Sequence, residues 1–191
     1  MSEITKTEFL KVVFTNIKSG EVFAYFIEEK QQYGIIQVFG KTKLGYNVRV
    51  FYNLVNEIDL DTINGIVNTK DFYYIKNFYK TDLLLGCVNR LGKFTVPEFV
   101  DIPKITRYSE RKPNGNLCWH ILEDDRYIKT YEEYNDEFKS LSPSAAWGIQ
   151  YIKRRWIDGF TLEKWNELED KWYREYLEIY EPEKLKEYKV L

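Results

Sequence analysis

The first two thirds of the chain carry the apolar patterning of short β-strands. Residues 21–28, 33–39 and 45–54 are rich in β-branched and aromatic side chains, and short polar segments separate them. Three successive strands with short connections favour an antiparallel meander that curls into a small sheet or barrel. Further strands are predicted at 11–17, 72–79, 83–88, 93–96 and 117–122, with a short helix at 60–68 and a strong turn at 112–116.

From about residue 130 the apolar spacing becomes helical. Ser142 and Pro143 predict the start of a helix that ends at Gly159, and Thr161 predicts the N-cap of a second helix. The two helices, joined by residues 158–160, are expected to form a helical hairpin that buries its apolar stripes mutually or against the sheet. The predicted stripes are Ala145, Ile149, Ile152 and Trp156 in the first helix, and Leu162, Trp165, Leu168, Trp172, Tyr176 and Tyr180 in the second.

These patterns predict an α+β fold. An antiparallel, partly barrel-like β-sheet occupies the N-terminal two thirds, and the C-terminal helical hairpin follows it. No Pro/Gly/Ser-rich linker, low-complexity tract or internal repeat interrupts the chain. We therefore expect residues 1–191 to form a single domain, with 1–125 mainly β and 130–191 mainly α and packed on the sheet.

The distribution of charged residues points to a possible function only in the C-terminal third of the chain. The net charge is −2, so no global field draws the chain to nucleic acid or to an anionic membrane. Residues 123–191, however, hold 17 acidic and 12 basic side chains, a balance of −5. This excess is typical of a solvated helical face, but it also predicts a partner-binding surface, for which the candidates are Glu123, Asp124, Asp125, Glu167, Glu169 and Asp170.

Cysteine content and the absence of targeting signals favour a cytoplasmic protein. Cys87 and Cys118 do not make a disulfide framework. Residues 1–10 have no basic start and no apolar run, and no stretch approaches the ~18 consecutive apolar residues of a membrane span. We expect no membrane association.

The search for catalytic chemistry leaves one pair. His120 is the sole histidine, and Cys118 precedes it by two residues in a predicted strand, so both side chains point to one face. A nucleophilic thiol with its base is one interpretation, and a buried thiol beside a hydrogen-bonded imidazole is the other. Two cysteines and one histidine in no ligand spacing predict no metal site, and phosphate-binding loops are absent. We expect no cofactor and no enzymatic activity.

Nucleic-acid binding is the alternative function. Lys153, Arg154 and Arg155 form a small basic cluster on the first C-terminal helix. Aromatic residues that stack bases in sheet-based RNA binders occur beside Lys76 and Lys80, although an aromatic core face explains them as well. These aromatic residues are Tyr73, Tyr74, Phe78 and Tyr79.

Two strand motifs resemble a known family. Residues 20–25 (GEVFAY) and 33–38 (YGIIQV), followed by residues 92–96 (GKFTV) with Pro97 and Phe99, resemble the immunity protein 26 family of bacterial polymorphic toxin systems. The resemblance covers residues 18–122, and Phe94 stands where the family usually has tryptophan. It implies a mostly β, intracellular immunity protein that neutralises a cognate toxin by direct binding. It identifies neither the contact residues nor the oligomeric state.

Overall fold

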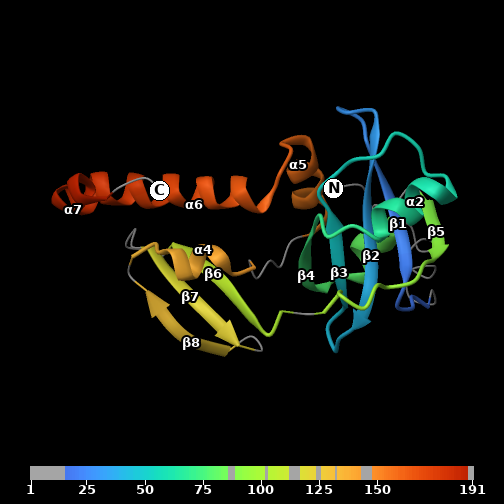
Figure 1. The fold of residues 1–191 in the computed structure, drawn as a ribbon, viewed down its shortest axis with the longest axis horizontal. Helices are drawn as coiled ribbons and strands as arrows, with labels where there is room; N and C mark the ends of the chain where they lie inside the picture. Colours follow the sequence, from blue (N-terminus) through green and yellow to red (C-terminus); the bar gives the residue numbers. More distant parts are fainter. Residues whose placement is uncertain are drawn as a thin grey trace. The chain divides into compact units, whose positions relative to one another are not determined.

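The computed structural model describes residues 16–85, 89–101, 103–111, 117–123, 126–131, 133–142 and 148–188. The chain forms two compact units, which we call the N-terminal unit (Met1–Ile102 and Ala145–Phe160) and the C-terminal unit (Pro103–Ser144 and Thr161–Leu191). Each contains one antiparallel sheet and its own helices, which confirms the α+β fold (Figure 1). The single domain expected from the sequence stays a prediction.

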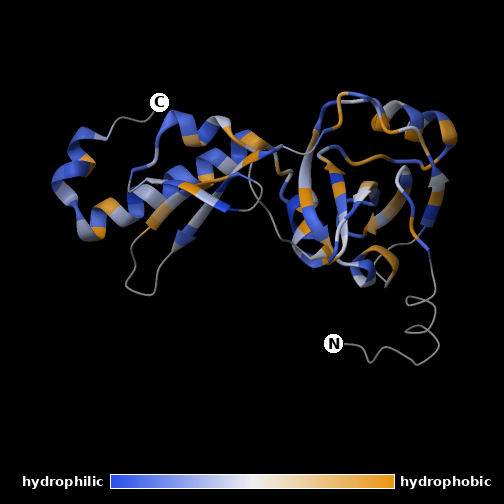
Figure 2. Ribbon diagram, turned by 90° about the horizontal axis from the view of Figure 1, so that it is seen from below, coloured by the Kyte–Doolittle hydropathy of each residue, from blue (hydrophilic) through white to orange (hydrophobic). Residues whose placement is uncertain are grey.

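The N-terminal unit contains a five-stranded antiparallel sheet of order β4-β3-β2-β1-β5. Its strands are β1 (Glu21–Ile27), β2 (Gln32–Lys41), β3 (Tyr46–Phe51), β4 (Phe72–Phe78) and β5 (Asn89–Lys93). The predicted meander is confirmed, and hydrophobic residues recur along its strands (Figure 2). In the described part of the chain neither sheet closes, so the expected partial barrel is an open sheet.

Two predicted strands need correction. Residues 83–85 belong to a short helix, α3 (Lys80–Leu85), because a short apolar run fits a buried helix turn as well as a strand. β5 covers 89–93, so the strand expected at 93–96 starts and ends earlier. Residues 16 and 17, the end of the strand expected at 11–17, are not in a strand, and the rest of that strand lies outside the described residues. Residues 86–88 and the turn predicted at 112–116 also lie outside the described residues.

One face of the five-stranded sheet packs on α2 (Leu60–Val67), the helix predicted at 60–68. Asp59 caps this helix, because its carboxylate accepts hydrogen bonds from the backbone N–H groups of residues 61 and 62. The core on this side consists of Val22, Ala24, Ile35, Phe51, Ile63, Ile66 and Val67. Among them lies the buried guanidinium of Arg49, which donates to Gln37 Oε1 and to the carbonyl of Val67 at the end of α2.

The opposite face of the same sheet packs on α5 (Ile149–Ile157). The predicted stripe of this helix is confirmed, since Ile149, Ile152 and Trp156 are buried; Ala145 lies outside the described residues. The indole of Trp156 occupies the space that a side chain at Gly34 would need, and its Nε1–H donates to the carbonyl of Phe51 at 2.7 Å. This contact fastens α5 to β2 and β3.

The start predicted for α5 is wrong. The helix begins at Ile149 with Gly148 as its N-cap. Ser142 lies too far back along the chain to cap it, and the Ser142 carbonyl accepts a hydrogen bond of 2.9 Å from the backbone N–H of Arg107 within the C-terminal unit. Pro143 lies outside the described residues.

The C-terminal unit has a three-stranded antiparallel sheet of β6 (Ile105–Arg111), β7 (Leu117–Glu123) and β8 (Arg126–Tyr131). Its helices are α4 (Asp136–Ser140), α6 (Leu162–Tyr180) and α7 (Pro182–Glu187). The core is aromatic: the ring of Trp119 meets that of Tyr173 edge-on, with centroids 4.9 Å apart. The buried cluster comprises Leu117, Trp119, Tyr134, Phe138, Tyr173 and Leu177.

The buried face of α6 agrees with the predicted stripe at Trp165 and differs from it further along the helix. Trp165, Glu169, Tyr173 and Leu177, spaced by four, point into the unit. Trp172 is 36% exposed and Tyr180 48% exposed, although both were predicted to be core residues. The stripes of α5 and α6 therefore bury against the sheets of their own units, which is one of the two outcomes that the sequence allowed.

Candidate functional site

Only some of the acidic residues predicted to form a binding surface are exposed. Glu123 is exposed at the end of β7, and Glu167 is exposed on α6. Asp170 is half-buried and accepts hydrogen bonds from Arg174 Nε and the Tyr188 hydroxyl. Glu169 is 1% exposed and lies inside the C-terminal unit. Asp124 and Asp125 lie outside the described residues.

Glu169 belongs to a buried polar network with Arg107 of β6. The guanidinium Nη2 lies 3.3 Å from Glu169 Oε2 and donates to Asn166 Oδ1 at 2.6 Å, while Nη1 donates to the Phe138 carbonyl at 3.0 Å. A buried cation is costly unless it is paired and hydrogen-bonded. This requirement explains why α6 turns a carboxylate, rather than Trp172, towards the sheet.

Burial raises the pKa of Glu169 above its ordinary value of 4.5, and the charge of Arg107 opposes the rise. The folded protein therefore holds this proton to a higher pH than the unfolded chain does. The associated stability is fully present below the unfolded pKa and is lost as pH rises through the folded pKa. We expect the free energy of unfolding of the parent protein to fall relative to that of Glu169→Gln as pH rises above 4.5. Urea unfolding of both proteins at a series of pH values measures this, and parallel pH profiles would contradict it.

The outer flank of α6 is the surface that the sequence reasoning missed. Leu168, Trp172, Glu175 and Ile179, spaced by four, three and four, share one side of the helix next to its buried face. Trp172 and Ile179 are exposed, the latter by 63%. Trp172 also lines a pocket of about 270 Å³ together with Ser109, Glu110 and Leu117. The helical spacing alone did not reveal this flank, because apolar residues at that spacing were predicted to be buried in the core.

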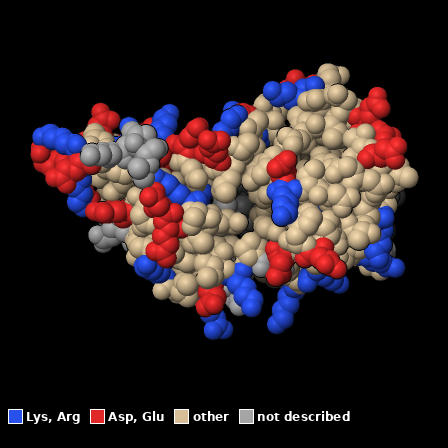
Figure 3. Space-filling view, viewed as in Figure 1, with Lys and Arg blue, Asp and Glu red and all other residues tan. Residues whose placement is uncertain are grey.

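The opposite flank of α6 is acidic. Glu163, Glu167 and Glu178 lie along it, interrupted by Lys171 and by Arg174, whose Nε donates to Asp170. Across the face drawn in Figure 3, acidic and basic side chains are interspersed rather than gathered into one field. The acidic excess of the C-terminal third therefore forms no continuous acidic surface on this face.

Cys118 and His120 share one face of β7, as predicted, but the hydrogen bonds of the histidine go elsewhere. His120 Nδ1 lies 2.9 Å from Thr130 Oγ1 on β8, and Nε2 lies 3.3 Å from Glu110 Oε2 on β6. Tyr108 stacks on the imidazole, and the Cys118 thiol is buried. This geometry favours the interpretation of a buried thiol beside a hydrogen-bonded imidazole.

The features that suggested nucleic-acid binding do not form a platform. Tyr73 and Phe78 are buried in the N-terminal unit, and Tyr74 packs edge-on against Phe39 and Phe72. Tyr79 alone of the four aromatic residues is well exposed.

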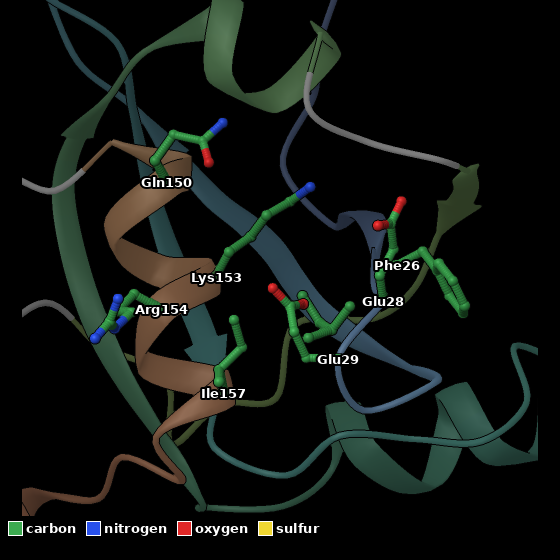
Figure 4. Close-up of a pocket in the computed structure, with 8 residues that line it drawn as sticks. Phe26, Glu28, Glu29, Gln150, Lys153, Arg154 and Ile157 are labelled. Atoms are coloured by element: carbon green, nitrogen blue, oxygen red, sulfur yellow. The ribbon is translucent and has the colours of Figure 1, made fainter.

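The basic cluster is similarly dispersed. Arg154 Nε lies 3.5 Å from the Asp158 carboxylate, and the Arg155 guanidinium covers the ring of Phe160 at 5.1 Å. Lys153 faces a cleft of about 400 Å³ between α5 and the β1–β2 turn (Figure 4). The three residues therefore do not act as one phosphate-binding patch.

Neither the described residues nor known proteins identify a family for this chain. The described residues hold no group of three or more His, Cys, Asp and Glu side chains placed to bind a metal ion. None of the described helices combines the length and apolar character that a membrane crossing needs. No protein-family model, curated protein or solved structure matches the chain. The resemblance to the immunity protein 26 family stays a prediction.

Proposed function

We propose that this chain is a bacterial immunity protein, which neutralises a cognate protein toxin in the cytoplasm by direct binding. The observation that carries the binding function is the outer flank of α6, where Trp172 is exposed beside an apolar pocket. The toxin as partner rests on the strand motifs at 20–25, 33–38 and 92–96.

An exposed tryptophan at the rim of a pocket supports protein recognition. Tryptophan, tyrosine and arginine dominate the residues that contribute most to protein interfaces. Covering the side chains of Trp172 and Ile179 would each contribute about 1.5 to 3 kcal/mol of apolar burial. Leu168 on the same flank is partly exposed, and the buried Leu117 forms part of the pocket lining. This flank has the character of an interface centre with a polar rim supplied by Glu175 and Glu110.

The acidic flank of α6 supports the same function in a different way. Glu163 and Glu167 are exposed and lie one turn apart. Exposed charges contribute more to association rate and to salt dependence than to affinity. We therefore assign them to attraction of a basic partner, whereas Trp172 contributes to affinity.

The decisive probe is the toxin that this proposal requires, which we expect to be the variable C-terminal domain of a large secreted protein encoded next to this gene. We expect the purified domain to bind this chain, and Trp172→Ala to weaken the complex about 100-fold, because removing such an anchor costs about 2 to 3 kcal/mol. Isothermal titration calorimetry measures the dissociation constant, and growth of cells that express the domain with either protein tests neutralisation.

Matched controls separate the two flanks. Tyr151→Ala removes an aromatic side chain that is 67% exposed on α5 and should change the affinity by less than about twofold. Charge reversal of Glu163 and Glu167 should slow association at low salt and leave dissociation nearly unchanged. If Trp172→Ala and Ile179→Lys both left the dissociation constant unchanged, this flank would not be the binding surface. If the neighbouring domain did not bind the parent protein, it would not be the cognate toxin.

A further inference from the structure

The cleft beside α5 contains opposite charges on its two walls. Lys153 and Gln150 line it from α5, and Glu28 and Glu29 line it from the turn that joins β1 to β2 (Figure 4). Ile27 and Ile157 also line it, whereas the ring of Phe26 points away from Lys153 and packs on Tyr33 (Figure 4). A volume of about 400 Å³ falls in the range of roughly 300 to 1,000 Å³ that is usual for small-molecule sites.

Three of the four charged side chains that line this cleft have no counter-ion within the described structure. Lys153, Glu28 and Glu29 make no ion pair with another residue of the described ranges, whereas the fourth, Arg154, pairs with Asp158. A cation and two carboxylates are thus presented to the same space without neutralising one another. A ligand that carries both signs of charge would satisfy all three.

Both walls of the cleft are held in place before any ligand binds. In the turn, the backbone N–H of Lys30 donates to the Ile27 carbonyl at 3.1 Å. Gln31 adopts a left-handed conformation, with φ of 52°, and its side-chain amide donates to the Glu28 carbonyl at 2.8 Å. Left-handed backbone at a non-glycine residue is held only when the surroundings over-determine it, and such residues cluster at functional sites.

The helical wall is fixed by its opposite side. Trp156 stands over Gly34, and its indole N–H bond to the Phe51 carbonyl prevents α5 from rotating about its axis. Lys153 therefore extends from a rigid element towards β1 (Figure 4). A pre-formed cleft spares a ligand much of the ordering cost of binding.

We infer that this cleft binds a small zwitterion of the α-amino-acid type, with its ammonium group at Glu28 and Glu29 and its carboxylate at Lys153. An anion alone would leave the two carboxylates without a counter-ion, and a cation alone would leave Lys153 without one. Ile27 and Ile157 favour an aliphatic side chain on the ligand. This inference is independent of the toxin partner and of α6, which belongs to the other unit.

Free L-leucine is the probe, titrated into the full-length protein and followed by the amide signals of Glu28, Glu29 and Lys153 in NMR spectra. A ligand with so few atoms is expected to bind with a dissociation constant of about 1 to 10 mM. Lys153→Met, and separately Glu28→Gln with Glu29→Gln, should each weaken binding about tenfold, because each removes a charge-assisted hydrogen bond. L-leucinamide and N-acetyl-L-leucine, which each lack one charge, should show the same loss with the parent protein.

Matched controls are Lys43→Met and Glu57→Gln, which remove exposed charges elsewhere in the N-terminal unit and should leave the titration unchanged. The inference is overturned if L-leucine moves none of the cleft signals. It is equally overturned if the cleft variants bind L-leucine like the parent, or if N-acetyl-L-leucine binds as well as L-leucine does.

Discussion

Replacing Arg107 by alanine is expected to lower the free energy of unfolding by about 3 to 5 kcal/mol, which is a large part of the stability of a domain. The substitution leaves the Glu169 carboxylate buried without its cation, and it removes the donors to Asn166 and to the Phe138 carbonyl. It also removes a guanidinium that covers the ring of Phe138 at 5.1 Å. Urea unfolding followed by circular dichroism gives the free energy.

A double substitution separates the ion pair from the space that it fills. Arg107→Met with Glu169→Met keeps much of the side-chain volume and leaves no charge without a partner. Buried ion pairs exchanged for apolar residues of similar size often cost little or even stabilise. We expect the double variant to be more stable than Arg107→Ala, and equal losses in the two proteins would show that packing, not charge, explains the effect.

Gly34→Ala is expected to destabilise the N-terminal unit by about 3 kcal/mol, at the upper end of the usual cost of overpacking. A methyl group at this position would lie 2.4 Å from ring atoms of Trp156, so the indole must move and break its bond to the Phe51 carbonyl. Because Trp156 holds α5, the same substitution should weaken L-leucine binding in the adjacent cleft. Thermal unfolding and the NMR titration measure the two effects.

Gly65→Ala is the matched control for this prediction. Gly65 lies inside α2, and nothing stands within 4 Å of the position that its β-carbon would take. Alanine is the better helix former by about 1 kcal/mol, so this substitution should raise stability. If Gly34→Ala proved as harmless as Gly65→Ala, the close approach of Trp156 to β2 would be wrong.

Local patterning sufficed for most elements of the fold. The first three strands, β4, β7 and α2 all lie where period-two alternation or helical spacing predicts them. Capping chemistry was reliable where the cap has no competing partner, as at Thr161, whose hydroxyl accepts from the backbone N–H of Lys164. It failed at Ser142, because the helix starts further along the chain, at Ile149 with Gly148 as its N-cap.

The candidate sites were harder to predict, because they depend on which side of a helix faces inward. The basic residues of α5 and the acidic residues of α6 were recognised as candidates, but their neighbours in space were not. Glu28 and Glu29 are distant in sequence from Lys153, and no local pattern joins them. The exposure of Trp172 was missed for the opposite reason, since an aromatic residue at helical spacing normally indicates a core position.

The sequence by itself determined the α+β class, the antiparallel meander and the amphipathic character of α5 and α6, because these follow from contacts between residues close along the chain. Only the tertiary structure decided the rotation of α6. A buried arginine on β6 needs an acceptor, and this demand places Glu169 inside while leaving Trp172 at the surface. The division into two units likewise depends on long-range packing, which separates two helices that adjoin in sequence.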